Sequence, residues 1–283
     1  MNAPFSPLTD ASAWQAELEL RVEARAARSV LANCRHAGPL RVQKALYPEG
    51  DGVCQILILH PPAGIAGGDH LHISLAVGTG AHAQTTTPGA GKWYRSKGPQ
   101  AFQNIELQVA AGGMLEWLPQ EAIVFNQAQA NSTTIMTLEE GARMIGWDIV
   151  CRGRAASGER FEAGNYRQRL RLQRPDGTPL WQEAMHLTGA DAAMPSAAGL
   201  AGGTVFGTLW LAGIGPDATL LEALRCISIK DGICGVSALP QITLVRAVAH
   251  SAETLRQYLE AAWTLARPVV LQRAAVPPRI WRT

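Results

Sequence analysis

The densest group of potential metal ligands in the sequence is Asp69-His70-Leu71-His72. Side chains alternate between the two faces of a strand, so a strand here places His70 and His72 on one face and Asp69 on the other. Two imidazoles suit a borderline metal ion such as nickel or zinc, although they complete only half of a stable coordination sphere. A polar strand surface is an equally good interpretation, and His60 and His82 add ligands only if the fold brings them near.

Three carboxylates lie beside aromatic or apolar residues: Glu116, Glu121 and Asp148. A strand can point such an acid into the interior, where an unpaired charge is costly unless water or an arginine accompanies it. Arg152 and Arg154 are near enough in sequence to pair with Asp148 or Glu159. The alternative for each acid is the solvated face of an amphipathic strand, which is the more common outcome.

Motifs for nucleotide chemistry are incomplete. The segment 89–93 resembles a phosphate loop, but Thr86 stands where that motif needs glycine and Trp93 where it needs Ser or Thr. The segment 64–69 lacks the second glycine of a dinucleotide fingerprint, and neither G-x-S-x-G nor H-E-x-x-H occurs. We therefore expect no catalytic activity; an enzyme using Glu116 and Glu121 as paired acids remains an alternative, although Pro119 interrupts any strand between them.

The elements that must position these residues are mainly strands. Strict alternation over 17–25 favours a strand there, although its alanine content also suits a helix. Further short strands are predicted between Gly, Pro and Asp-Gly turns, at 40–46, 53–60, 71–77, 82–86, 101–109, 114–118, 133–138, 143–151 and 165–173. Many short strands at short spacing predict one mainly β body rather than βαβ units.

Helical patterns occur only in the last third. Segments 217–225 and 252–263 contain good helix formers, with Asp217 and Ser251 as N-caps, and Pro268 is predicted to end the second helix. The Gly/Ala-rich segment 188–215 is predicted to be a mobile loop before this helical part. We expect a single domain over 1–283 with residues 1–13 as a flexible tail. The two helices and the loop near 190–203 are the expected docking region for a partner.

Composition excludes several classes of partner and compartment. Twenty-five Lys and Arg against 23 Asp and Glu give a formal charge of +2, which is too small to indicate a nucleic acid or an anionic membrane surface. Five cysteines without a C-x-x-C pair indicate neither a disulfide framework nor a zinc knuckle, and they suit a reducing cytoplasm. No secretion signal or membrane-spanning run is apparent.

Eight segments, in order from residue 38 to the last residue, resemble the UreD family of urease accessory proteins. They are 38–44, 46–50, 60–69, 86–95, 115–121, 146–148, 153–159 and 278–283. Departures are small: Ala63 and Ala66 replace the common Gly and Val, Trp93 replaces Phe, and Asp148 replaces Glu. Only the change at Ala63 narrows the backbone angles available in its turn.

The resemblance implies a β-helix-like body with two helices and a non-catalytic chaperone that helps insert nickel into urease. The implied partners are UreF, through it the GTPase UreG, and the urease apoprotein. No cofactor is permanently bound, because Ni²⁺ is the transient cargo of a water-filled passage through the protein. A pure docking scaffold, whose acids are only structural, is the other interpretation.

On this resemblance, six residues are expected to line or flank the nickel route: Asp69, Thr86, Thr87, Glu116, Glu121 and Asp148. An ion in transit needs weak, exchangeable oxygen ligands, since a cage of imidazoles or thiolates would retain it. His70 and His72 lie beyond the shared Gly-Gly-Asp segment and are weaker candidates.

Overall fold

Alternating polar and apolar residues give the chain most of its strands. In β1 (Gln15–Arg25) the apolar residues Ala16, Leu18, Leu20 and Val22 are buried, while the residues between them are exposed. The computed structural model describes residues 13–189, 191 and 194–282, and 49% of the chain is strand against 13% helix. The mainly β prediction is thus confirmed. The predicted tail at 1–13 lies, apart from Ala13, outside the described residues.

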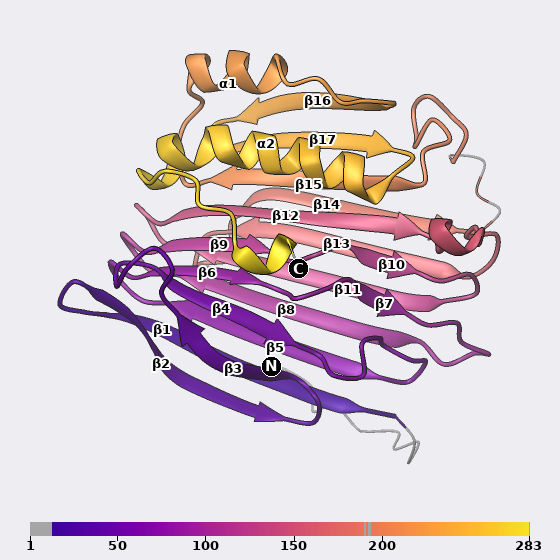
Figure 1. Cartoon of the computed structure of the whole chain (residues 1–283), viewed down its shortest axis with the longest axis horizontal. Coiled ribbons are helices and arrows are strands. Elements are labelled where there is room, and N and C mark those ends of the chain that lie inside the picture. Colours follow the sequence, from indigo (N-terminus) through magenta and orange to yellow (C-terminus); the bar gives the residue numbers. More distant parts are fainter. Residues whose placement is uncertain (1–12, 190, 192–193, 283) are drawn as a thin grey trace.

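Successive strands of the central part alternate between two sheets. One sheet, here called sheet A, contains the parallel strands β5 (His70–Val77), β8 (Ala101–Val109), β11 (Gln129–Leu138) and β13 (Asn165–Gln173). The other, sheet B, contains the parallel strands β4 (Cys54–Leu59), β6 (His82–Thr86), β9 (Met114–Leu118) and β12 (Arg143–Arg152). Each coil of chain therefore adds one strand to each sheet, which gives the β-solenoid-like arrangement (Figure 1).

Antiparallel strands extend both sheets at their edges. In sheet A, β1 continues the parallel series beside β5, the antiparallel β2 (Arg28–Ala37) follows it at that edge, and the antiparallel β14 (Pro179–Thr188) lies at the other edge. Sheet B has β3 (Arg41–Leu46) at one edge and β15 (Val205–Ala212), β17 (Ile242–Ala249) and β16 (Gly232–Leu239) at the other. The short strands β7 (Gly91–Trp93) and β10 (Ala122–Val124) pair with each other, and β10 also pairs with β12.

The central strands of sheet B are buried on both faces. Trp117 and Trp210 point toward sheet A and belong to the core between the sheets. Trp147 and Trp263 belong to a second core, which lies beneath helix α2 (Ala252–Leu271). Figure 1 shows α2 lying across sheet B, with α1 (Ala218–Arg225) and the short C-terminal helix η2 (Arg279–Arg282) on the same side. The 3-10 turn η1 (Ala155–Ser157) follows β12.

Both helices begin at the predicted caps. The Asp217 carboxylate accepts the N–H of Leu220 at 2.7 Å, and the Ser251 hydroxyl accepts the N–H of Thr254 at 3.4 Å. The prediction that Pro268 ends the second helix is wrong, because α2 continues to Leu271. Val270 and Leu271 are fully buried on sheet B, and burying two aliphatic side chains, at about 1.5–3 kcal/mol each, offsets the roughly 3 kcal/mol that an internal proline costs.

The predicted loop over 188–215 is wrong for its second half, which contains a strand. Residues Val205–Ala212 form β15, which lies between β12 and β17 and has every residue buried. A strand buried on both faces shows no polar alternation, so periodicity does not reveal it. The strands β16 and β17 of the last third were likewise not predicted. Among the described residues, no helix has the length and apolar character needed to cross a membrane.

Candidate functional site

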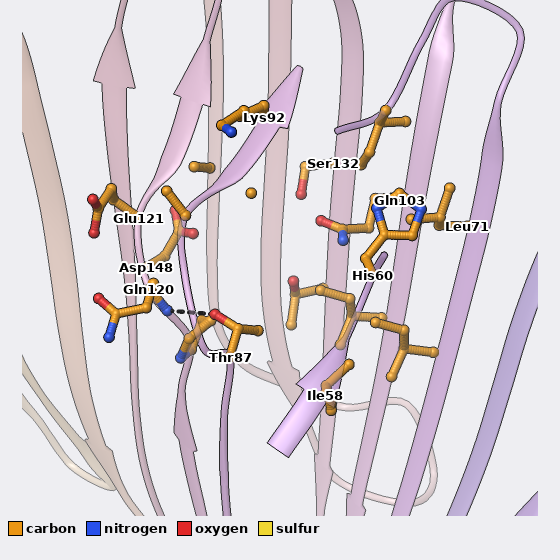
Figure 2. A pocket seen from close by; sticks show the side chains of 18 of the residues that line it. Ile58, His60, Leu71, Thr87, Lys92, Gln103, Gln120, Glu121, Ser132 and Asp148 are labelled. Carbon is orange, nitrogen blue, oxygen red and sulfur yellow. Dashed lines mark hydrogen bonds between the residues drawn. The ribbon is translucent and has the colours of Figure 1, made fainter. Parts of the chain in front are cut away.

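A pocket of about 270 Å³ lies between the two sheets. Its walls are largely apolar and include Ile58, Trp93, Trp117 and Trp210. Polar side chains from both sheets enter it, and the segment 87–93 borders it (Figure 2). The segment that resembles a phosphate loop is therefore part of the pocket wall.

Asp148 reaches this pocket because of its position in β12. The neighbouring Trp147 points to the α2 side of sheet B, so alternation turns Asp148 toward sheet A. There the Gln168 side-chain amide donates a hydrogen bond to the Asp148 carboxylate and lies 3.2 Å from the Tyr166 hydroxyl. This bond crosses from sheet A to sheet B and fixes the carboxylate at the pocket wall.

The Asp148 carboxylate has no salt bridge among the residues that the structure describes. Burial raises its pKa to about 6; the Gln168 hydrogen bond opposes this shift and the Glu183 carboxylate adds to it. The predicted arginine partners lie elsewhere. Arg154 pairs with Glu159 at 2.7 Å, which was one of the two pairings predicted for it. Arg152 does not pair with Asp148; it donates hydrogen bonds to the Met194 sulfur and the Gly203 carbonyl.

A polar row crosses the inner face of sheet A next to Asp148. Strand register aligns Gln103 of β8, Ser132 of β11 and Gln168 of β13. Because adjacent strands are about 4.8 Å apart, the row spans about 10 Å. Gln103 and Ser132 line the pocket, and Gln168 completes the row at Asp148. These three residues are not among the sites predicted from the sequence, although Gln103 and Gln168 are polar residues at positions where their strands otherwise place apolar side chains inward.

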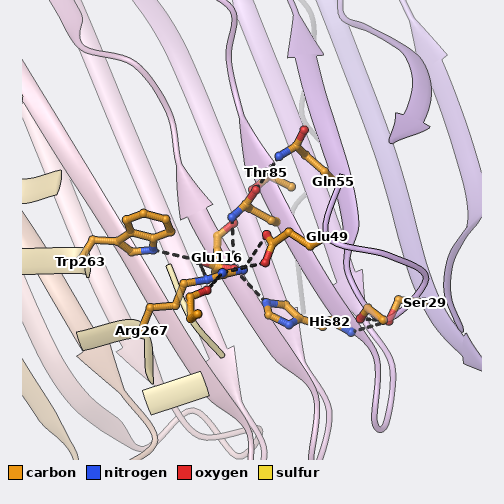
Figure 3. Close-up of polar contacts among 11 residues, drawn as sticks. Ser29, Glu49, Gln55, His82, Thr85, Glu116, Trp263 and Arg267 are labelled. Atoms are coloured by element: carbon orange, nitrogen blue, oxygen red, sulfur yellow. Dashed lines mark hydrogen bonds and ion pairs between the residues drawn. The ribbon is translucent and has the colours of Figure 1, made fainter. Parts of the chain in front are cut away.

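Glu116 lies in a different environment, on the α2 side of sheet B (Figure 3). Its carboxylate accepts hydrogen bonds from the Trp263 indole at 2.8 Å and from the Arg267 guanidinium at 2.9 and 3.0 Å, and it lies 2.9 Å from His82 Nε2. Arg267 also pairs with Glu49 at 2.8 Å. Burial alone would raise the pKa of Glu116, but His82 and Arg267 outweigh burial and lower it.

The six residues expected along one route thus fall in three places. Thr87, Glu121 and Asp148 line the pocket. Thr86 and Glu116 face the α2 side, where the Thr86 hydroxyl accepts from the Trp281 indole at 2.9 Å. Asp69 is buried outside the pocket lining, and its carboxylate accepts the backbone N–H groups of Trp14 and Ala66, both at 2.8 Å.

The histidine pair lies on the outer face of sheet A. His70 and His72 are half-buried and share one face of β5, as alternation predicts, and the His70 ring stacks on Phe102 with centroids 4.6 Å apart. In the described part of the chain, no group of three or more His, Cys, Asp and Glu side chains is arranged to hold a metal ion. Glu116 and Glu121 do not form an acid pair either, since Glu121 lines the pocket and Glu116 is enclosed under α2.

The pocket offers chemistry for a weakly held cation. Its donors include the carboxylates of Asp148 and Glu121, the hydroxyls of Ser132 and Thr87, and the Gln103 amide. Oxygen donors of this kind bind divalent ions with exchangeable ligands, and the apolar walls strengthen the attraction to a carboxylate.

Comparison with known proteins assigns the family. The family model described as UreD urease accessory protein matches residues 15–282. A Dechloromonas aromatica protein named urease accessory protein UreD is 50% identical over 286 residues, which cover 99% of this chain and 98% of that protein. A protein of the same name from Pseudomonas fluorescens Pf-5 is 49% identical over 284 residues, covering all of both chains. A third, from Ralstonia nicotianae, is 44% identical over 290 residues, with 99% of this chain and 98% of that protein covered. The resemblance in the eight segments is confirmed, and the chain belongs to the UreD family of urease accessory proteins.

Proposed function

We propose that this chain is a non-catalytic maturation factor that passes nickel ions toward the urease apoprotein through the pocket at Asp148. Membership of the UreD family supports a role in urease maturation. The finer parts of the proposal are the nickel cargo, the cytoplasmic setting and the assembly with UreF and, through it, UreG. The helices α1 and α2 and the segment near 190–203 stay the predicted docking region for UreF.

The observation that carries the nickel proposal is the Asp148 carboxylate in the pocket between the sheets. With a pKa of about 6 it is mostly ionised at pH 7, and no cation of the described chain neutralises it. An ionised carboxylate beside a largely apolar wall attracts a divalent ion, because its field is poorly screened there. Asp148 is therefore the residue whose charge is available to a cargo ion.

The neighbouring donors favour transit over storage. Ser132 and Gln103 lie along the row that leads away from Asp148, and neutral oxygen donors of this kind hold a borderline ion weakly. An ion that leaves Asp148 thus meets ligands that it can exchange. This arrangement supports a conduit rather than a closed metal site.

The test replaces Asp148 with leucine and compares it with Glu106→Leu. Glu106 is an exposed acid on the outer face of sheet A, so it serves as a matched control. Assembly with UreF, UreG and urease apoprotein is followed by size-exclusion chromatography, and nickel in the recovered urease by metal analysis. We expect normal assembly for both variants. The nickel content of the urease should be at least about tenfold lower for Asp148→Leu only, because an apolar side chain that cannot bind the ion replaces an ionised donor.

Equal loss of assembly and nickel delivery in Asp148→Leu would support the second candidate, a docking scaffold without a metal route. The positions of Glu116 and Asp69 favour that candidate, since both acids are used in structural contacts. Normal nickel delivery by Asp148→Leu would reject the pocket as the route.

A further inference from the structure

His60 extends from sheet B into the pocket. It follows directly after β4 and continues the inward series of Ile56 and Ile58, both of which are buried between the sheets. The N–H of Ala63 donates to the His60 carbonyl at 2.8 Å and closes a turn in which Ala63 has a left-handed φ of 59°. This turn fixes the backbone at His60. Figure 2 shows its ring on the side of the pocket opposite Asp148, with Ser132 between them in this view.

The imidazole carries an unused donor or acceptor. His60 Nε2 is buried and has no hydrogen-bond partner within the described residues. The large majority of buried side-chain polar atoms are paired in folded proteins, so an unpaired ring nitrogen on a residue that lines a pocket points to a ligand. Burial lowers the pKa of His60, although Asp69 opposes the shift. The ring nitrogen that carries no proton in a neutral imidazole has a lone pair for a metal ion.

Gln103 provides the link between His60 and Asp148. It lines the same pocket and is the first member of the polar row that continues through Ser132 to Gln168 at Asp148. A divalent ion at His60 would have an imidazole nitrogen and water as ligands, and the Gln103 amide oxygen of the same pocket is a further candidate. Such an incomplete set binds a borderline metal without enclosing it.

His82 provides an internal comparison. Its Nδ1 is also buried and unpaired in the described chain, but its Nε2 contacts Glu116 in the ion cluster under α2. It does not line the pocket between the sheets. Only His60 combines an unpaired ring nitrogen with a position at this pocket.

We propose that His60 is a nitrogen-donor station for a divalent transition metal ion, at the end of the polar row opposite Asp148. The proposal rests on the proposed function, because it adds a second station to the same pocket. An ion would exchange between an imidazole at one end and a carboxylate at the other.

The test uses the full-length protein with two probes. Titration calorimetry with Ni²⁺ gives the affinity, and pulsed electron paramagnetic resonance with one equivalent of Cu²⁺ detects a coordinated imidazole. His60→Gln is the test variant and His72→Gln is the control, since His72 is a half-buried histidine on the outer face of sheet A. Circular dichroism checks folding, and Gln103→Leu is a second variant that keeps His60 in place.

We expect the imidazole signal in the unaltered protein and in His72→Gln, and its loss in His60→Gln. Ni²⁺ affinity should fall about tenfold in His60→Gln, which corresponds to about 1.4 kcal/mol, and by a smaller factor in Gln103→Leu. The proposal that His60 binds the metal ion is rejected if the imidazole signal persists in His60→Gln or is absent from the unaltered protein. If His60→Gln does not fold, an unchanged Ni²⁺ affinity in Gln103→Leu overturns it instead.

The experiments distinguish failure of the nickel route at Asp148 from failure of the metal site at His60. Absence of imidazole coordination together with lost nickel delivery in Asp148→Leu rejects the His60 station and keeps the route. A His60-dependent signal together with normal delivery in Asp148→Leu keeps a metal site at His60 and rejects the route.

Discussion

Glu116 and Asp148 lie on neighbouring strands of sheet B, yet their side chains enter different regions of the molecule. Glu116 faces α2, where Arg267, His82 and Trp263 hold its carboxylate and its pKa is lowered. Asp148 faces sheet A, where an amide is its partner and burial raises its pKa to about 6. Burial acts to raise the pKa of both carboxyls, so the presence or absence of a cation decides the outcome. A paired acid stabilises the fold, and an unpaired one stays available to a ligand.

The two environments follow from strand alternation and register. Gly146 of β12 pairs with Trp117 of β9, whose side chain points toward sheet A. Glu116 is one residue before Trp117 and faces α2, whereas Asp148 is two residues after Gly146 and faces the pocket. Glu116 lies opposite Ile145 in this register, three residues before Asp148, and this odd offset places the two carboxylates on opposite faces of sheet B.

The largest expected effect comes from removing the cation under α2. Arg267→Met leaves Glu49 and Glu116 without their shared guanidinium, and breaking a buried pair in this way costs about 3–5 kcal/mol of unfolding free energy. Urea unfolding at pH 7 measures the loss. Arg256→Met is the control on the same helix, because Arg256 donates to the neutral Gln120 side-chain amide and has no salt bridge among the residues that the structure describes. Similar small losses in both variants would contradict the structural role of the cluster.

Acid should weaken the α2 side through Glu116. Its folded pKa lies below the ordinary value, so its contribution is fully present above the unfolded pKa of about 4.3 and is lost as pH falls through the folded pKa. We expect the unfolding free energy to decrease below about pH 4.3, and to decrease less steeply in Glu116→Gln. Urea unfolding between pH 3 and pH 6 tests this, with Glu106→Gln as the exposed control. Parallel curves for all three proteins would refute the prediction.

The pocket side should show the opposite pH dependence, with a smaller amplitude. Because the folded pKa of Asp148 is raised to about 6, its ionisation costs stability as pH rises from the ordinary aspartate pKa of about 3.9 to about 6, and the full cost persists above that pH. Asp148→Asn should therefore raise the unfolding free energy at pH 8 by on the order of 1–2 kcal/mol and leave it nearly unchanged at pH 4. Thermal unfolding at the two pH values measures the difference. A variant less stable than the original at pH 8 would show that the charge is satisfied after all.

The smallest effect concerns the carboxylate near Asp148. Glu183 raises the pKa of Asp148 and is itself paired with Arg246 at 2.6 Å. Glu183→Gln should lower the pKa of Asp148 by less than about one unit, because it removes a negative charge and leaves Arg246 unpaired. Carboxyl carbon NMR titration measures the midpoint. Asp176→Asn, which changes an exposed acid in a turn, should leave the midpoint in place.

Much of the fold could be predicted from alternation. Buried and more exposed residues alternate along the half-buried strands β1 and β5, and the sequence pattern predicts the positions of both strands. The strand β15 was missed because both of its faces are buried, and α2 runs past Pro268 because tertiary packing outweighs local propensity. Those two features depend on neighbours that a local pattern does not contain.

The candidate site could be predicted only in part. Thr87, Glu121 and Asp148 are predicted site residues that do line one pocket. The sequence does not show, however, that strand alternation places Thr86 and Glu116 on the opposite face of sheet B. The cation at Arg267 is 151 residues from Glu116, so no local pattern relates them. The polar row from Gln103 to Gln168 needs strand register, which becomes visible only in three dimensions.

The long separation within the ion cluster has a consequence for synthesis on the ribosome. Arg267 also lies 218 residues from Glu49, so both acids leave the exit tunnel well before their guanidinium has been translated. The solenoid coils can form early from neighbouring segments, while the outer face of sheet B carries two uncompensated charges and an uncovered apolar surface. That face is completed only when α2 emerges, which makes the nascent chain most dependent on folding helpers at this late stage.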